Sequence, residues 1–372
     1  MHTPWVRRVV AISLSLACGG GARPVTVGDG SGGSASLIRL PAMNESRAGH
    51  TATTLLDGRV LIVGGLSSGT SAGAELYDPS TRRFTPTGKL RVARAAHTAT
   101  LLADGRVLIA GGFNGEWLSS TEVYDPGAGT FSRGPEMLEP RSDHIAISLR
   151  DGRVLFVGGT STGYTFLASA ELLDPAGLRF ARTGAMSSAR ESHVGVLLPN
   201  GTVLIAGGHA GRREAIRLYE TAELYDPDRG TFRSVGPMTR RRHKHAGALL
   251  PDGRVLITGG ADERDDQGEY RDAEVYDPRS ERFSVVGEMR RARYKHQGTM
   301  TLLADGRLLI AGGAGDPELF DPATGRFTLV PSSNALAGNF SAVARVADGH
   351  VLIAGGYGNG TGPRNSAWLF VP

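Results

Sequence analysis

The feature that most constrains this chain is a unit that recurs seven times, at intervals of 43–53 residues. Each unit contains a Gly-Gly pair, and seven residues before each pair an Asp or Asn is followed by Gly. Six units continue with Asp-Pro, and Phe stands six residues after that Asp. The Gly-Gly pairs begin at Gly64, Gly111, Gly158, Gly207, Gly259, Gly312 and Gly355. Units of this length bury their apolar surface by stacking on one another, so the chain is predicted to be a repeat protein.

Each unit predicts four short antiparallel strands, which in the first unit are expected at residues 50–56, 59–63, 74–77 and 84–88. Asp57-Gly58 suits the two-residue hairpin turn between the first two strands, because both positions accept positive φ. The second strand is apolar on both faces, which requires cover on both sides. No segment shows sustained helical periodicity. A four-stranded sheet with two apolar faces, repeated about every 47 residues, predicts an all-β, seven-bladed propeller.

The unit resembles the kelch repeat, whose marks are the Gly-Gly doublet after the second strand and Tyr-Asp-Pro after the third, with an aromatic residue six positions on. In this chain that aromatic residue is Phe, where kelch repeats usually have Trp. The resemblance covers residues 36–372. It implies the propeller fold, and it implies little about activity, because such propellers include both enzymes and adaptors.

The two ends of the repeat region predict how the ring closes. The seventh unit has expected strands near 340–346, 351–354 and 367–370, without a fourth. Leu37 stands six residues before Met43, as Phe84 stands six before Leu90. We therefore expect Leu37–Met43 to supply the missing fourth strand by pairing with Ala367–Phe370, which removes the open sheet edges.

Six units carry Arg three residues before His, and a Glu on the third strand. The Arg/His/Glu sets are Arg47/His50/Glu75, Arg94/His97/Glu122, Arg141/His144/Glu171, Arg190/His193/Glu223, Arg242/His245/Glu274 and Arg293/His296/Glu318. The seventh unit loses all three together, which predicts a buried Arg–Glu pair beside the His that holds each blade. A metal bound by the six imidazoles is the alternative. A seven-fold ring would hold them too far apart to share one ion with bonds of about 2.0–2.1 Å. We expect no metal site and no cofactor.

Two enzyme classes share this repeat type. Galactose oxidase and glyoxal oxidase resemble the chain in their Gly-Gly and Asp-Pro pattern, but their chemistry needs a Tyr–Cys crosslinked copper site and a Tyr-His pair. Here the single Cys, Cys18, precedes the propeller, and no Tyr is directly followed by His. A carbohydrate-active propeller of the epimerase kind remains the alternative, and would need an acid–base pair in a central pocket.

The N-terminus predicts export. Residues 1–17 read as a signal peptide, with Arg7 and Arg8 before the short apolar run Val9–Ala17. Leu-Ala-Cys at residues 16–18 resembles a bacterial lipobox, so Cys18 is expected to carry lipid and anchor the protein to a membrane. The alternative is ordinary cleavage after Ala17. Residues 18–35 are a Gly/Ser-rich tether. We expect an outer-membrane or cell-surface lipoprotein, or otherwise a periplasmic or secreted protein.

Loop lengths distinguish the two faces of the predicted propeller. The turns between strands 1 and 2 and between strands 3 and 4 are uniform. The interval from the Gly-Gly pair to the third strand varies from 5 to 15 residues. We call the side that carries these 2–3 loops and the 4–1 links the variable face. Recognition is expected there, because loops that differ on a regular scaffold carry function.

Arg and Lys concentrate on the variable face in units four to six, opposite an acidic loop at residues 262–272. We predict ligand contacts by Arg212, Arg213, Arg240, Arg241, Lys244, Arg290, Arg291, Lys295 and Trp117. Mutual ion pairing is the plainer interpretation of the same charges. The aromatic residues of this face look scattered, so no continuous sugar platform is expected. The acidic loop could bind calcium, although it lacks the EF-hand order.

The sequence thus predicts a non-catalytic binding or scaffold propeller that recognises a protein or an anionic glycan. A net charge of +4 over 372 residues is too small to indicate a nucleic-acid partner.

Overall fold

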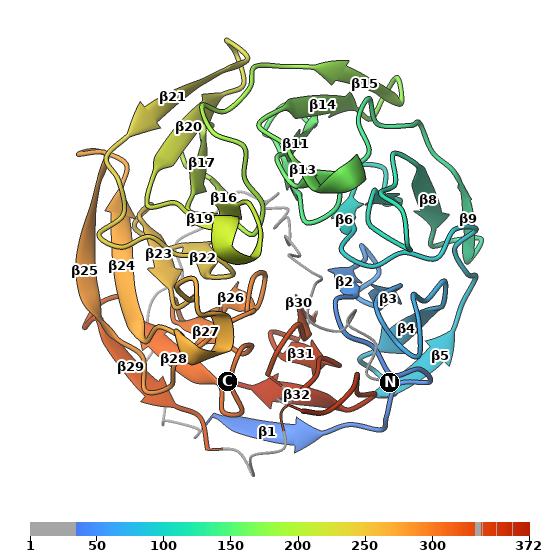
Figure 1. Cartoon of the computed structure of the whole chain (residues 1–372). Helices are drawn as coiled ribbons and strands as arrows, with labels where there is room; N and C mark the ends of the chain where they lie inside the picture. The colour runs from blue at the N-terminus through green and yellow to red at the C-terminus, as the bar shows by residue number, and fades with distance from the viewer. Residues whose placement is uncertain (1–34, 332–335, 337, 347, 359) are drawn as a thin grey trace.

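A computed structural model describes residues 35–331, 336, 338–346, 348–358 and 360–372. Seven four-stranded antiparallel sheets stand around a central axis (Figure 1). The predicted signal peptide, Cys18 and all but the last residue of the predicted tether lie outside the described residues.

Each sheet is one blade, with its first strand innermost and its fourth strand outermost (Figure 1). Blade 1 consists of β2 (Thr51–Thr54), β3 (Val60–Val63), β4 (Ala74–Asp78) and β5 (Arg83–Pro86). Blade 2 consists of β6 (Thr98–Leu101), β7 (Val107–Ala110), β8 (Thr121–Asp125) and β9 (Thr130–Arg133). Blade 3 consists of β10 (Ile145–Ser148), β11 (Val154–Val157), β14 (Ala170–Asp174) and β15 (Arg179–Arg182).

The remaining blades follow the same order. Blade 4 consists of β16 (Val194–Leu197), β17 (Val203–Ala206), β20 (Ala222–Asp226) and β21 (Thr231–Val235). Blade 5 consists of β22 (Ala246–Leu249), β23 (Val255–Thr258), β24 (Asp272–Asp277) and β25 (Arg282–Glu288). Blade 6 consists of β26 (Met300–Leu302), β27 (Leu308–Ile310), β28 (Glu318–Asp321) and β29 (Arg326–Leu329). Blade 7 consists of β30 (Ala342–Arg345), β31 (Val351–Ala354), β32 (Ala367–Val371) and β1 (Ser36–Arg39).

The ring closes as the sequence predicted, because β1 pairs with β32. Leu37 lies opposite Phe370, and Arg39 lies opposite Trp368. The closing strand is shorter than expected and ends at Arg39 rather than at Met43, which packs in the core beyond it. The blade that contains both ends of the propeller therefore has four strands like the other six.

Apolar residues fill the space between neighbouring blades. The second strands are buried along their whole length, as in β3, where every residue from Val60 to Val63 is inaccessible. This explains why the strand is apolar on both faces, since each face packs against a different blade. The Phe of the fourth strand packs on the Tyr of the third, as Phe84 does on Tyr77 with ring centroids 5.0 Å apart.

The Gly-Gly pair makes close backbone contacts on two sides. Gly64 and Gly65 both have positive φ, at 65° and 95°. A Cβ on Gly64 would lie 2.6 Å from the carbonyl oxygen of Arg94 and 2.7 Å from the His97 ring of the next blade. A Cβ on Gly65 would lie 2.8 Å from the carbonyl oxygen of Ala48 in its own blade. Only glycine satisfies both the dihedral angles and these distances.

The predicted Arg–Glu pair is present in all six units, and both side chains are buried. The N···O distances are 3.1 Å for Arg47–Glu75, 3.2 Å for Arg94–Glu122, 2.7 Å for Arg141–Glu171, 3.3 Å for Arg190–Glu223, 2.8 Å for Arg242–Glu274 and 2.9 Å for Arg293–Glu318. The Arg also donates to the carbonyl of the first glycine of the pair, at 2.8 Å from Arg47 to Gly64. The pair therefore holds the start of the blade against its 2–3 loop.

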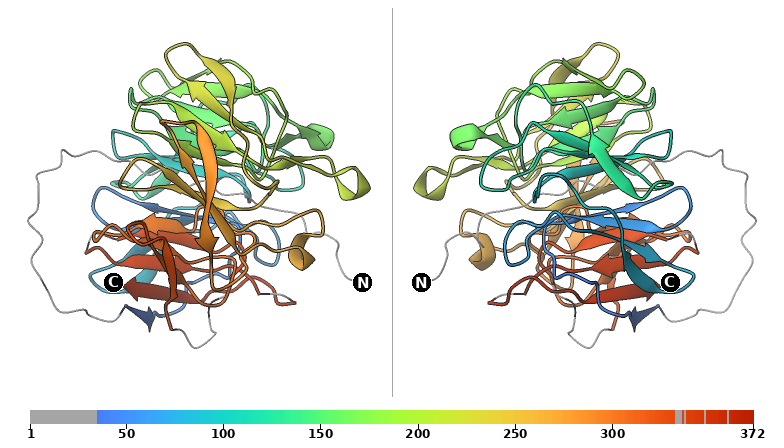
Figure 2. Two further views of the ribbon diagram at one scale, coloured as in Figure 1. Left: turned by 90° about the vertical axis from the view of Figure 1, so that its left-hand side faces the viewer. Right: turned by 90° about the vertical axis from the view of Figure 1, so that its right-hand side faces the viewer.

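Short strands and 3-10 turns lie in the 2–3 loops of the middle blades. Blade 3 carries β12 (Thr160–Ser161), η1 (Thr162–Tyr164) and β13 (Thr165–Phe166); blade 4 carries β18 (His209–Ala210), η2 (Arg213–Ala215) and β19 (Arg217–Leu218); blade 5 carries η3 (Asp265–Gln267). These 3-10 turns project from one side of the disc (Figure 2), which is the variable face. In the part of the chain that the structure describes, no helix has the length and apolar character to cross a membrane.

Candidate functional site

The two residues between the repeated Arg and His form an inner ring on the variable face. They precede the innermost strand of each of these six blades, and the second of the two has positive φ, between 53° and 62°, as Phe340 has in blade 7. Backbone hydrogen bonds join these positions from blade to blade. The amide of Lys244 donates to Ser192, that of Lys295 to Lys244, and that of Phe340 to Lys295, at 3.0–3.1 Å. The ring therefore places side chains from successive blades next to one another.

The residue types on this inner ring differ sharply around the propeller. The pairs in blades 1 to 6 are Ala48-Gly49, Ala95-Ala96, Ser142-Asp143, Glu191-Ser192, His243-Lys244 and Tyr294-Lys295. Blades 1 and 2 therefore show that the fold needs only small side chains here. The left-handed conformation favours Gly, so Lys at two of these positions is not explained by the backbone. Chemically versatile side chains are concentrated in blades 4 to 6.

Loop residues complete this group of side chains. We call the following eight residues the central cluster: Glu191, His209, His243, Lys244, Asp265, Tyr294, Lys295 and Tyr357. His209, Asp265 and Tyr357 come from the 2–3 loops of blades 4, 5 and 7, and the others come from the inner ring.

One side of the central cluster is a chain of hydrogen-bonded acids and imidazoles. Glu191 Oε1 lies 3.1 Å from His209 Nε2, and His209 Nδ1 lies 3.3 Å from His243 Nδ1. His243 Nε2 in turn lies 3.2 Å from Asp265 Oδ1 and 3.2 Å from a backbone carbonyl oxygen. Burial and the charge of Lys244 lower the pKa of His243 to about 3, so this imidazole is neutral at pH 7.

The contacts of His243 fix which of its ring nitrogens carries the hydrogen. His243 Nε2 faces two acceptors and therefore carries the hydrogen, which leaves its Nδ1 to accept from His209. Burial raises the pKa of Glu191, but its hydrogen bond with His209 outweighs this effect and lowers it. The Glu191 carboxyl is therefore ionised at neutral pH and lies next to the His209 ring.

The other side of the central cluster surrounds two lysines. Lys244 Nζ lies 3.0 Å from Asp265 Oδ1 and donates to the Tyr294 hydroxyl at 2.8 Å, while Tyr294 donates to Asp265 at 2.5 Å. Burial raises the pKa of Asp265, but its hydrogen bond from His243 and the charge of Lys244 outweigh burial and leave it below the usual range. Burial and the Asp265 carboxylate raise the pKa of Tyr294. Lys244 is therefore paired with a carboxylate and a hydroxyl group.

Lys295 has different surroundings. Its Nζ donates to the Tyr357 hydroxyl at 2.9 Å and lies 4.7 Å from the Tyr294 ring centroid and 5.5 Å from those of Phe340 and Tyr357. Burial and the neighbouring charge of Lys244 lower the pKa of Lys295 to about 8. Burial and the charge of Asp266 raise the pKa of the nearby Glu269 carboxyl to about 7. Both groups can exchange protons near neutral pH.

Of the nine residues predicted from sequence to bind ligand, the structure places Lys244 and Lys295 in the central cluster. The others lie on the loops around it and contact neighbouring side chains or backbone where a partner is defined. Three arginines form ion pairs: Arg240 with Asp272 at 3.1 Å, Arg241 with Glu263 at 3.1 Å and Arg291 with Asp316 at 3.0 Å. Arg290 donates to the Phe327 carbonyl at 3.3 Å, and the guanidinium carbon of Arg212 lies 3.2 Å from the centroid of the Tyr164 ring. Arg213 lies exposed in η2. Much of the basic charge on this face is thus neutralised within the chain.

Trp117, the ninth residue, belongs to an aromatic group. Its ring centroid lies 4.9 Å from that of Phe113 and 4.7 Å from that of Tyr164, so the expectation that these aromatic residues are scattered is wrong for these three. The rings meet edge to face, and the loops of blades 2 and 3 bring them together. The sequence places Tyr164 on a different repeat from Phe113 and Trp117, and only the loop conformations decide that the three rings meet.

Sequence reasoning missed Glu191, His209, His243 and Tyr294 as site residues. One signal was available, because the two positions between the constant Arg and His change from Ala-Gly in one unit to His-Lys in another. The residues flanking these positions are the constant ones that hold the blade. A change of side-chain chemistry between fixed neighbours indicates a role other than packing.

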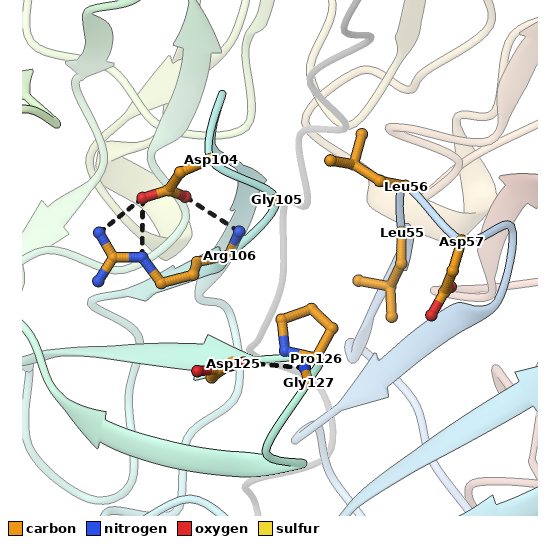
Figure 3. A pocket seen from close by; sticks show the side chains of 9 residues that line it. All are labelled: Leu55, Leu56, Asp57, Asp104, Gly105, Arg106, Asp125, Pro126 and Gly127. Carbon is orange, nitrogen blue, oxygen red and sulfur yellow. Dashed lines mark hydrogen bonds and ion pairs between the residues drawn. The ribbon is translucent and has the colours of Figure 1, made fainter.

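The opposite face of the disc carries a recess of about 430 Å³ between blades 1 and 2 (Figure 3). It is lined by the 1–2 turns of both blades and the 3–4 turn of blade 2: Leu55, Leu56, Asp57, Asp104, Gly105, Arg106, Asp125, Pro126 and Gly127. Arg106 Nε donates to Asp104 Oδ2 at 2.8 Å, and Asp125 accepts from the amide of Gly127 at 2.8 Å. These contacts recur in the turns of other blades, so the recess reflects the repeat.

Across the residues that the structure describes, no group of three or more His, Cys, Asp or Glu side chains is arranged to hold a metal ion. The acidic loop considered for calcium is instead held by basic groups, with Asp262 bonded to Arg264 and Asp265 to Lys244.

Comparison with known proteins agrees with the fold. The model of the Kelch motif matches residues 94–138, which span blade 2. Human Kelch-like protein 23 is 33% identical over 75 residues, which are 20% of this chain and 13% of that protein. The chain therefore spans only a small part of this curated relative.

Two solved structures have a similar fold. A fungal alcohol oxidase of the AA5 family in complex with copper has a TM-score of 0.71 at 16% identity, over 90% of this chain and 75% of that one. YjhT has a TM-score of 0.61 at 14% identity, over 78% of this chain and 99% of that one. The protein is a β-propeller with seven blades, and its second blade matches the Kelch motif.

Proposed function

We propose that the protein binds a small carbohydrate ligand at the central cluster on the variable face. The observation that carries this proposal is the inner ring, where blades 1 and 2 have Ala and Gly while blades 4 to 6 have Glu, His, Tyr and Lys in the same backbone conformation. Aromatic rings beside a few convergent polar groups are the usual composition of a site for a small polar molecule. Hydroxyl groups of a sugar match both the carboxylate and the ammonium groups here.

The expectation of an anionic partner at the arginines becomes the competing form of this proposal. Arg240, Arg241 and Arg291 are ion-paired within the chain, so binding an anion would require these pairs to exchange partners. Exposed pairs of this kind are worth about 0–1 kcal/mol, so breaking them costs little free energy, and replacing them by pairs with a ligand adds little affinity. The central cluster offers groups that are already held in place.

Calorimetric titration of the full chain with a panel of neutral and acidic mono- and oligosaccharides tests the proposal. Glu191→Gln removes the charge next to His209 and should weaken binding at least tenfold. Arg106→Ser on the opposite face is the matched control and should leave the affinity unchanged. A loss of binding with Arg240→Ser and none with Glu191→Gln would place the ligand at the arginines instead.

A second candidate function is proton-transfer catalysis on a sugar. It is favoured by the pair Glu269 and Lys295, whose pKa values of about 7 and about 8 suit a general acid and a general base near neutral pH. Incubation of candidate sugars in D2O with the protein would show it, because NMR detects deuterium incorporated at the carbon that loses its proton. Unchanged spectra for every sugar that binds would leave binding as the function.

A further inference from the structure

Lysine is rare in this chain compared with arginine. Lys and Arg together number 41, and only three of them are Lys: Lys89, Lys244 and Lys295. Lys89 is exposed, whereas the other two occupy equivalent inner-ring positions in neighbouring blades. A chain that uses Arg for nearly all its cations therefore places two of its three primary amines side by side in the central cluster.

Arg and Lys differ in one chemical property that matters here. Guanidinium remains protonated at any physiological pH, whereas an ammonium in a desolvated site can lose its proton and become a nucleophile. A positive charge alone would be supplied as well by Arg. The presence of Lys indicates a site at which a neutral amine is useful.

The two lysines are not equivalent in their contacts. Lys244 is paired with the Asp265 carboxylate, with 3.0 Å between Nζ and Oδ1. Lys295 forms no ion pair with any carboxylate that the structure describes, and three aromatic rings surround its Nζ. An apolar environment and an adjacent cation are the two conditions that favour a free amine, and Lys295 has both.

We propose that Lys295 Nζ forms an imine with the carbonyl carbon of an aldehyde or ketone bound at the central cluster, such as the open-chain form of a reducing sugar. The inference rests on the proposed function, because it assigns a chemical step to the ligand of the same site. It also narrows the ligand class to carbonyl compounds.

The step balances without an oxidant or reductant. The amine lone pair forms a C–N bond while the C=O π electrons move to oxygen, which takes a proton, and the nitrogen loses one. The resulting hydroxyl group accepts a second proton and leaves as water as the C=N bond forms. That proton can come from solvent or from the Glu269 carboxyl, whose pKa of about 7 leaves it partly protonated near neutral pH.

Reductive trapping tests the proposal on the full chain. The protein is incubated with glycolaldehyde and sodium cyanoborohydride near pH 7, and peptide mass mapping locates the modified lysines. Labelling of Lys295 should exceed that of exposed Lys89 by at least about tenfold, because an amine of pKa about 8 is far more often neutral than an ordinary lysine near 10.4. Equal or faster labelling of Lys89 would overturn the proposal.

Two variants separate reactivity from folding. Lys295→Arg keeps the positive charge and should abolish the label at that position, with the melting temperature serving as the check on folding. Lys244→Met removes the neighbouring cation and should slow labelling of Lys295, while Lys89 labels at the same rate. An unchanged rate for Lys295 in folded Lys244→Met would contradict the proposed activation.

The outcomes distinguish this inference from the proposed function. Sugars that bind in the calorimeter without any trapping at Lys295 would overturn the imine and leave the binding site intact. Selective trapping by glycolaldehyde, in a protein to which no sugar binds, would support the reactive lysine and contradict carbohydrate recognition.

Discussion

The six repeated histidines make this propeller sensitive to acid. They are His50, His97, His144, His193, His245 and His296, all fully buried between blades. Burial, with the charge of the adjacent Arg as the next cause, lowers the pKa of each far below its ordinary value of 6.5, to about 3 for His50, His193 and His296. The native state therefore keeps these rings neutral where the unfolded chain protonates them.

The sign and size of the effect follow from proton linkage. Between about pH 6.5 and 5 the unfolded chain binds more protons, so the free energy of unfolding falls as pH falls, by about 1.4 kcal/mol per pH unit and per histidine. Each ring then contributes a loss of about 2 kcal/mol by pH 5, and six contribute about 12 kcal/mol. His243 adds to this loss, while Glu269, with its raised pKa, opposes it as a single half-buried group. The loss is as large as the stability of most domains, about 5–15 kcal/mol.

Urea unfolding followed by circular dichroism at several pH values between about 7 and 5 measures this dependence. The unfolding midpoint should fall steeply, and the native state should be lost before about pH 5. His97→Gln should make the dependence shallower by about one proton. A midpoint that is the same at both ends of the range would refute the reasoning, since it would mean that the buried rings take up protons without disturbing the blades.

Three further predictions concern other parts of the chain. Deleting residues 36–40 removes β1 and should strongly lower the melting temperature of the propeller by opening blade 7, and an unchanged melt would show that ring closure does not depend on it. Arg242→Met should destabilise the fold by about 3–5 kcal/mol, because it leaves Glu274 buried without its partner, whereas Arg240→Ser on the exposed loop should change stability by less than about 1 kcal/mol; denaturant titrations would compare them. Metabolic labelling with a fatty acid should mark the exported protein, and Cys18→Ser should abolish both the label and membrane association; a soluble, unlabelled wild type would instead indicate ordinary cleavage after Ala17.

The amino-acid sequence by itself determined the architecture of this protein. Seven units of one pattern predict a ring of stacked sheets as the way to bury strands that are apolar on both faces, and a unit that lacks its fourth strand at one end matches a spare strand at the other. The Arg–Glu pairs could also be predicted, because residues that are lost together in one unit form one structural group. These inferences succeed because they depend on spacing within a unit, which the repeat displays seven times.

The composition of the central cluster was decided by the tertiary structure. Glu191 and His209 come from blade 4 and Asp265 from blade 5, and their distances depend on loops whose lengths and conformations differ from unit to unit. The same holds for the ion pairs of Arg240, Arg241 and Arg291, because the spacing of the repeat does not relate the residues that these pairs join. A propeller brings one segment of every blade to its axis, so the chemistry there arises from residues that only closure of the ring places side by side.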